Sequence, residues 1–127
     1  DLDNLQTFHS LFSNWRFHIP DYLGSLTDQI VPGYFHETLP GFLKLHPEPA
    51  AFVHIDCNLY SSTKTVLDHL AERICPGTVI VFDEFFNYPG WKEHEYRAFD
   101  ELIRATGKTF EYLGYVYNYY QVAVRFL

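Results

Sequence analysis

Two apolar runs in the middle of the chain each end in acidic residues. Residues 51–55 form a short, mostly apolar run that ends at Asp56. Residues 78–82 form a second and more apolar run, which ends at Asp83 and Glu84. Short runs that are rich in β-branched and aromatic residues predict two β-strands, each followed directly by carboxylates.

Between these runs the apolar positions change to a helical period. They recur at the spacing of one helix face, at Val66, Leu67, Leu70, Ala71 and Ile74. The Ser-Ser-Thr run at 61–63 supplies the N-cap candidates, and Pro76-Gly77 ends the pattern. A strand, a helix and a strand in this order predict a right-handed parallel crossover, in which both strands end at the same edge of the sheet.

That edge is where open α/β sheets bind their ligands. We therefore expect Asp56, Asp83 and Glu84 to lie close together, where a proton, a cation or a basic group must offset their repulsion. Oxygen ligands alone suit a hard cation, of which Mg²⁺ is the first candidate. The residues also leave a plainer interpretation open. In it, Asp56 caps the next helix and the Asp83-Glu84 pair lies in a solvated loop.

The flanking segments predict further elements. Residues 1–13 fit an amphipathic helix, and residues 29–31 fit a short strand. Residues 34–40 fit one helical turn, which Pro40-Gly41 separates from a helix-like run at 42–45.

The C-terminal third predicts a helix followed by a hairpin. The helix runs from about residue 92 to residue 106, and Gly107 is placed to cap it. Two β-rich runs follow, at 110–116 and 119–126. Because only Tyr117-Asn118 separates them, we expect an antiparallel pair. The element order then predicts a mixed α/β sheet of parallel strands with an antiparallel C-terminal hairpin and helices on its faces.

Composition narrows the class of protein. The 127 residues, 47% of them hydrophobic, suit a single domain over 1–127 with an ordinary core. The net charge of −7 and the absence of a Lys/Arg cluster argue against a nucleic-acid partner. Cys57 and Cys75 lack the spacing of a metal-binding pair, which favours a reducing compartment, the cytoplasm. No apolar run reaches transmembrane length, so we expect no membrane partner.

Several linked runs resemble one enzyme family. They are HIDCNLYSSTKTVLDHL, PGTVIVFDEFFNYPGW and HEYRAF, with GYFHETLP upstream. Together they resemble the macrocin O-methyltransferase type of S-adenosylmethionine-dependent methyltransferase over residues 31–127. The final hairpin also looks like the end of a class I methyltransferase sheet. The resemblance therefore implies part of a Rossmann-like methyltransferase fold.

The resemblance implies a concrete chemistry. Members of this family bind a divalent cation, usually Mg²⁺, at positions that match Asp56, Asp83 and Glu84. The metal would hold a substrate diol, lower the pKa of one hydroxyl and align it with the methyl donor, S-adenosylmethionine. Asp56 is also implied as the acceptor of the hydroxyl proton. The implied function is metal-assisted O-methyl transfer to a hydroxyl of a small, sugar-like substrate.

Other positions are implied less directly. The Gly33-Tyr34-Phe35 segment resembles the part of such enzymes that passes the adenine of the cofactor. His36, His54 and His94 are further candidates for proton transfer.

The chain departs from the family pattern in the cofactor-binding half. No two of its seven glycines are separated by a single residue, so it lacks the G-x-G turn that lets the backbone approach the cofactor. Asn58 stands where the family usually has a second Asp, Glu84 stands where Asp is frequent, and His9 stands where an Asp is expected. The chain thus resembles the C-terminal half of a methyltransferase.

Two expectations follow from this resemblance to one half. Loss of the first strand would leave the strand at 51–55 with an unpaired edge, and exposed edges invite pairing. We therefore expect a homo-oligomer, or association with a missing N-terminal half. The competing hypothesis is a non-catalytic remnant or half that acts as a binding or assembly module.

Overall fold

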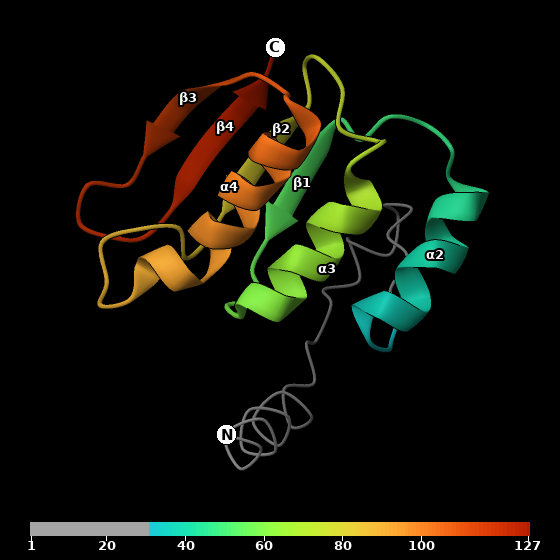
Figure 1. The fold of residues 1–127 in the computed structure, drawn as a ribbon, viewed down its shortest axis with the longest axis horizontal. Helices are drawn as coiled ribbons and strands as arrows, with labels where there is room; N and C mark the ends of the chain where they lie inside the picture. Colours follow the sequence, from blue (N-terminus) through green and yellow to red (C-terminus); the bar gives the residue numbers. More distant parts are fainter. Residues whose placement is uncertain (1–30) are drawn as a thin grey trace, which may run out of the picture. The chain divides into compact units, whose positions relative to one another are not determined.

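A mixed sheet of four strands organises residues 31–127, the part of the chain that the computed structural model describes. The strands are β1 (Phe52–Ile55), β2 (Val79–Phe82), β3 (Phe110–Tyr115) and β4 (Val122–Phe126), in the spatial order β1-β2-β4-β3. β1 and β2 are parallel, and β4 is antiparallel to β2 and to β3 (Figure 1). The predicted mixed α/β sheet is confirmed, with β4 inserted between the two strands that precede it in the chain.

The predicted elements before Val31 lie outside the described residues, and so does His9. Residues Pro32–Leu127 form one compact unit. The single domain over 1–127 stays a prediction.

The crossover between β1 and β2 is helix α3 (Tyr60–Leu70), as the sequence predicted. Its start differs from the prediction, because residues 61–63 lie inside the helix and Leu59 occupies the N-cap position without a side-chain cap. Asn58 adopts a positive φ of 55°, a conformation that Asn tolerates, so the chain turns before the serines are reached. The completely buried Thr63 therefore packs in the interior and does not cap the helix.

Helix α4 (Glu95–Thr106) follows a short 3₁₀ turn, η2 (Trp91–Glu93). The sequence predicted one continuous helix here. The backbone breaks at His94, whose φ of −112° and ψ of −125° are not helical. The predicted C-cap is confirmed, because Gly107 takes the left-handed conformation with φ of 66° and donates its N–H to the Ile103 carbonyl.

The hairpin of β3 and β4 is antiparallel as predicted, but its turn is longer than two residues. The connection runs over residues 116–121, and the Val116 N–H donates to the Gln121 carbonyl at 3.1 Å. The pairing register also shifts between Tyr112 and Gly114, which marks a bulge in β3. Sequence spacing alone does not reveal either feature.

Helix α2 (Phe35–Leu45) corrects the prediction of two helical pieces, because it continues through Pro40. A proline in the second turn removes a backbone hydrogen bond and crowds the preceding turn. Tertiary contacts offset that cost. Leu39 and Leu43 pack against the core, and the Arg73 guanidinium donates to the Leu43 carbonyl at 3.2 Å.

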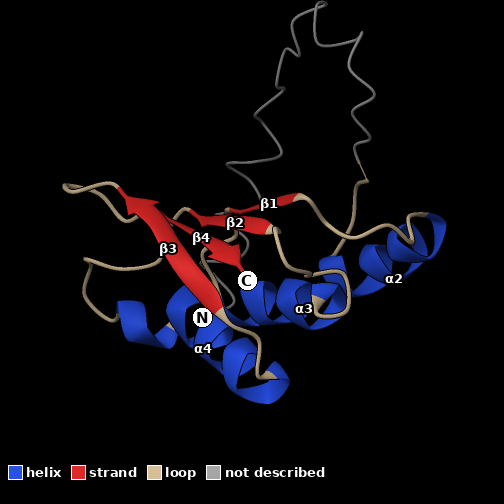
Figure 2. Cartoon of the chain, turned by 90° about the horizontal axis from the view of Figure 1, so that it is seen from above, coloured by secondary structure: helices blue, strands red, loops and turns tan. Residues whose placement is uncertain are grey.

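The three described helices lie on one face of the sheet (Figure 2). Strand side chains that point to this face are buried, among them Ile80, Phe82 and Val124. On the opposite face Phe52 is 62% exposed. The sequence predicted helices on the faces of the sheet, and within residues 31–127 they cover one face.

Candidate functional site

The carboxyl ends of β1 and β2 meet at one edge of the sheet. Ile55 pairs with Phe82 in the parallel register, and the Asp83 N–H donates to the Ile55 carbonyl at 2.9 Å. Asp56 and Asp83 therefore each come directly after one member of a pair of residues on adjacent strands. The two acidic residues lie side by side, as the sequence predicted. The Asp56 side chain is exposed, whereas Asp83 and Glu84 are half-buried. We call Asp56, Asp83 and Glu84 the acidic edge.

The acidic edge is electrostatically coupled. Burial raises the pKa of Glu84 above its ordinary value, the negative charges of Asp83 and Asp56 raise it further, and His94 acts in the opposite direction. Such coupling requires that the charges lie near one another. Among residues 31–127, however, no group of three or more His, Cys, Asp or Glu side chains is arranged to hold a metal ion. The Mg²⁺ site therefore stays a prediction.

A fourth carboxyl, that of Glu95, lies beneath the acidic edge and is completely buried. Its Oε2 atom accepts the backbone N–H of Glu84 at 3.0 Å. Burial raises the pKa of Glu95 to about 7, while the N–H groups of Glu84, Cys57 and Asn58 act to lower it. The N–H groups of Cys57 and Asn58 are near but not well aligned, since Oε1 has no hydrogen-bond partner within the described part of the chain. Glu95 thus faces the turn after β1 and the turn after β2.

The loop between β3 and β4 also contacts the acidic edge. The Gln121 amide donates from Nε2 to Oδ1 of Asp83 at 3.0 Å. The Tyr88 hydroxyl donates to the Glu84 carbonyl at 3.0 Å, and burial raises the pKa of Tyr88 to about 12. Asp83 and Glu84 are therefore held by contacts from two loops.

Sequence reasoning missed Glu95 and Gln121. Both residues form hydrogen bonds with residues that are distant in the sequence. The one local signal of Glu95 was its place at the start of a helix, inside the HEYRAF run. Gln121 is a polar residue in an aromatic loop, a weak signal by itself.

The three candidate histidines lie in different places. His94 precedes α4, lies close enough to Glu84 to influence its pKa, and has a buried Nδ1 atom without a hydrogen-bond partner in the described region. His54 is exposed on β1, between residues whose side chains pack into the core. His36 is exposed on α2, 3.8 Å from a carboxylate oxygen of Glu37. Of the three, His94 is the one that the fold brings to the acidic edge.

The segment predicted to pass the cofactor lies where α2 begins. Gly33 has a φ of 138°, and a Cβ atom there would lie 2.7 Å from Cγ2 of Thr38. Tyr34 and Phe35 are exposed. Within residues 31–127 no hydrogen bond joins this segment to the acidic edge. Its cofactor role stays a prediction.

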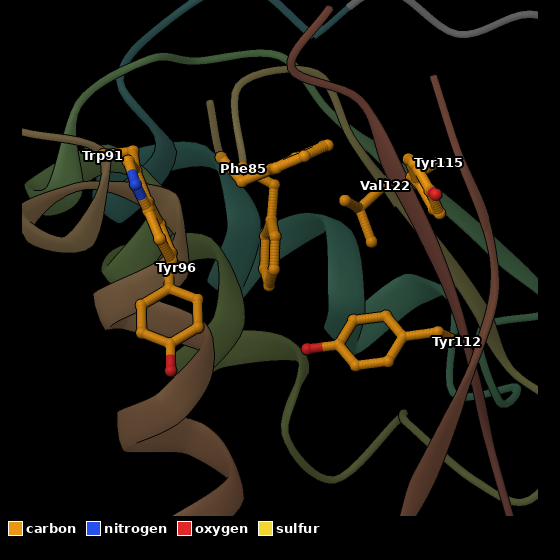
Figure 3. A pocket seen from close by; sticks show the side chains of 7 residues that line it. Phe85, Trp91, Tyr96, Tyr112, Tyr115 and Val122 are labelled. Carbon is orange, nitrogen blue, oxygen red and sulfur yellow. The ribbon is translucent and has the colours of Figure 1, made fainter. Parts of the chain in front are cut away.

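A pocket of about 290 Å³ is lined by side chains from η2, α4, β3, β4 and the loop after β2 (Figure 3). We call it the aromatic pocket, and it is lined by Phe85, Phe86, Trp91, Tyr96, Tyr112, Tyr115 and Val122. Phe85 directly follows Glu84, and Val122 directly follows Gln121. Two residues that line the pocket are therefore adjacent in sequence to a residue that forms the acidic edge and to a residue that holds it.

Residues 18–111 match the family profile of macrocin-O-methyltransferase (TylF). This stretch contains β1, α3, β2 and the whole acidic edge. The chain belongs to the macrocin O-methyltransferase family. The family resemblance noted in the sequence is confirmed, and the Rossmann-like interpretation of the sheet gains the support of solved methyltransferase structures.

Individual relatives are longer than this chain. One is 8-demethyl-8-(2,3-dimethoxy-alpha-L-rhamnosyl)-tetracenomycin-C 4'-O-methyltransferase of Streptomyces olivaceus, which is 36% identical over 64 residues, 49% of this chain and 23% of the relative. Another is CalS11, a TDP-rhamnose 3'-O-methyltransferase of calicheamicin biosynthesis. Its apo structure matches with a TM-score of 0.59 and 27% identity, over 75% of this chain and 39% of that one. A second CalS11 structure gives the same TM-score over 36% of its chain. The chain thus spans well under half the length of these relatives.

Proposed function

We propose that this chain forms the acceptor-activating part of an S-adenosylmethionine-dependent O-methyltransferase that acts on a hydroxyl of a sugar-like substrate. The observation that carries the proposal is the acidic edge, in which Asp56 and the Asp83-Glu84 pair emerge side by side from two parallel strands. Both named relatives are described as methylating rhamnose-containing compounds, which supports a sugar hydroxyl as the acceptor.

Methyl transfer to a hydroxyl requires a base at the acceptor. The acceptor oxygen bonds to the methyl carbon, the carbon–sulfur bond of the cofactor breaks, and the hydroxyl proton must leave. In our proposal the Asp56 carboxylate accepts that proton, since it is exposed at the end of β1. His94, beside Glu84, is the second candidate.

The same three carboxylates are our proposed ligands for Mg²⁺. Their oxygen atoms match the preference of a hard cation, and their mutual repulsion would be relieved by one. The present side-chain positions do not converge into a ready site, and Asp83 is engaged by Gln121. Binding would therefore require these side chains to turn toward each other. A bound Mg²⁺ would lower the pKa of an acceptor hydroxyl.

The cofactor site needs more polypeptide than residues 31–127 supply. Within this part of the chain β1 pairs on one side only, with β2, and the sheet face that carries Phe52 has no helix over it. We propose that polypeptide equivalent to the part of the relatives that this chain does not cover adds to β1 and completes the site. A second copy of this chain is the alternative occupant.

A non-catalytic role is the second candidate function. It is favoured by Asn58, which stands where the resemblance implies an Asp, and by the absence of a G-x-G turn. A binding or assembly module with this fold would have no affinity for S-adenosylmethionine, with or without Mg²⁺.

Calorimetric titration of S-adenosylmethionine into the purified chain, with and without Mg²⁺, separates these functions. Saturable binding at micromolar concentration supports the enzyme. An absence of heat under both conditions, from a chain shown by circular dichroism to be folded, indicates either a half-site or a non-catalytic module. Titration of Mg²⁺ then separates these two, because our proposal gives a cation site to the half-site alone.

Two further observations bear on where the protein works. No helix between residues 31 and 127 combines the length and the apolar character needed to cross a membrane. Cys57 and Cys75 are both free thiols. A reducing, cytoplasmic location is consistent with the free thiols and stays a proposal.

A further inference from the structure

The aromatic pocket is an unassigned cavity at the same sheet edge as the carboxylates. We propose that it binds a planar apolar ring carried by the acceptor sugar, as in an aryl glycoside, while a sugar hydroxyl lies at the acidic edge. This inference rests on the proposed function and names the part of the substrate that the carboxylates do not recognise.

The position of the pocket supports this assignment. Phe82, at the end of β2, pairs with Val122, which pairs in turn with Tyr115 at the end of β3. The β3 end therefore lies two strand spacings, about 10 Å, from the β2 end that carries Asp83. A ring joined to a sugar spans a gap of this order, so one molecule can reach both places.

The geometry of the rings suits a flat ligand. The Trp91 and Tyr96 rings lie 4.8 Å apart at 82°, and Phe85 meets both Tyr96 and Tyr112 at 72°. Rings that meet at steep angles present faces on some sides of a cavity and edges on others (Figure 3). A planar ring can then stack on one face and meet the edge of another, the arrangements that aromatic pairs prefer.

The lining also has the right polarity. Almost all of its accessible atoms are carbon, so a charged or strongly hydrogen-bonding group would lose its water without finding partners. Phe85 is only 3% exposed and fixes the base of the pocket, whereas Tyr115 at the rim is 67% exposed. A ligand ring would cover this exposed apolar surface. The volume is at the lower limit for small-molecule sites, which suits one or two rings.

The pocket is not placed for the adenine of the cofactor. It lies beside β3, at the end of the sheet opposite β1, where we propose that the cofactor site is completed. The remaining source of a planar ring is the nucleobase of a nucleotide sugar. The apolar lining favours the aryl group, because the polar edges of a base would stay unpaired.

Calorimetry with three probes tests the proposal, in the absence of Mg²⁺ and cofactor. The probes are 4-nitrophenyl α-L-rhamnoside, methyl α-L-rhamnoside and thymidine diphosphate. We expect the nitrophenyl glycoside to bind at least about tenfold more tightly than the other two, since burying a ring is worth more than 1.4 kcal/mol. Equal affinities for the two rhamnosides overturn the proposal, and tightest binding of thymidine diphosphate overturns the choice of an aryl group.

Variants of single residues test whether the nitrophenyl rhamnoside binds in the pocket. Tyr115→Ala removes an exposed rim ring and should weaken nitrophenyl rhamnoside at least about fivefold, whereas Tyr115→Phe should retain the affinity. Tyr117→Ala is the matched control, because Tyr117 is 80% exposed and does not line the pocket. Wild-type affinity in Tyr115→Ala overturns the proposal.

A tryptophan signal gives an independent readout. The chain has two tryptophans, Trp15 and Trp91. In the Trp15→Phe chain, quenching by the nitrophenyl ring should saturate with the calorimetric Kd, and an unquenched Trp91 contradicts the proposal. The outcome is independent of the proposed metal chemistry. Quenching of Trp91 without any binding of Mg²⁺ would contradict the metal-assisted function alone. Binding of Mg²⁺ without quenching would contradict the assignment of the pocket alone.

Discussion

The carboxyl of Glu95 accepts the backbone N–H of Glu84, with 3.0 Å between Oε2 and the nitrogen. This fully buried side chain at the start of α4 also faces the N–H groups of Cys57 and Asn58. This carboxyl therefore holds the turn that carries Asp83 and Glu84. The position of Glu84 in the acidic edge depends on a residue that is not part of it.

Glu95→Ala should destabilise the fold and loosen the acidic edge. The buried N–H of Glu84 would lose its acceptor, which costs about 1–3 kcal/mol, and the vacated space adds to that cost. Glu95→Gln keeps an oxygen for this N–H and should lose less. The free energy of unfolding in urea measures the effect. Glu72→Ala is the control, because Glu72 is exposed. Equal stability of the Glu95→Ala and control chains would contradict the structural role of Glu95.

The raised pKa of Glu95 predicts a pH dependence of stability in the metal-free chain. Its ordinary pKa is 4.5 and its pKa in the fold is about 7, so the folded state binds more protons than the unfolded state between these values. The free energy of unfolding should therefore fall as pH rises from about 4.5 to 7, by about 1–3 kcal/mol from this group. Glu95→Gln cannot titrate and should lose this part of the slope. Identical pH profiles for the two chains in urea unfolding would exclude the effect.

Two glycines of the α2 region form a matched pair. Gly33→Ala forces a Cβ atom within 2.7 Å of Thr38 and requires a φ of 138°, so it should destabilise by about 1 kcal/mol or more. Gly41→Ala lies inside α2 with no atom within 4 Å of the new Cβ, and it should stabilise by about 0.5–1 kcal/mol. Helical circular dichroism during urea unfolding measures both. The account is wrong about this segment if the two changes have the same sign.

Within residues 31–127 β1 pairs on one side only, and this edge predicts self-association of the purified chain. Phe52 on β1 is 62% exposed, and an unpaired regular edge attracts another strand. Light scattering at high concentration should report a mass above that of a monomer. Phe52→Lys should reduce this mass, because a charged residue on an edge strand opposes pairing. A monodisperse wild-type monomer would exclude a second copy of the chain as the partner of β1.

The main elements were predictable because their signals are local. The apolar runs before Asp56 and Asp83 gave β1 and β2 within one residue, and the helical period between them gave α3, which ends at Leu70 although the pattern continues to Ile74. The C-cap at Gly107 followed from the conformational freedom of one residue type. The acidic edge then followed from the rule that parallel strands end on the same side.

The features that escaped prediction depend on contacts between distant parts of the chain. Pro40 does not break α2, because Leu39 and Leu43 pack against the core and Arg73 binds the Leu43 carbonyl at the end of the helix. The start of α3 depends on a positive φ at Asn58, and Gln121 reaches Asp83 only when the hairpin folds back. A single sequence carries no local signal for such pairings.

Calorimetric titration of Mg²⁺ into the metal-free chain tests the central claim most directly, namely that the acidic edge is a cation site. We expect saturable binding by the wild type and by Asp68→Asn, whose substitution removes a surface ion pair with Lys64. Asp83→Asn should abolish binding while its circular dichroism spectrum stays unchanged. Wild-type affinity in a folded Asp83→Asn chain, or no binding by the wild type, would contradict the account.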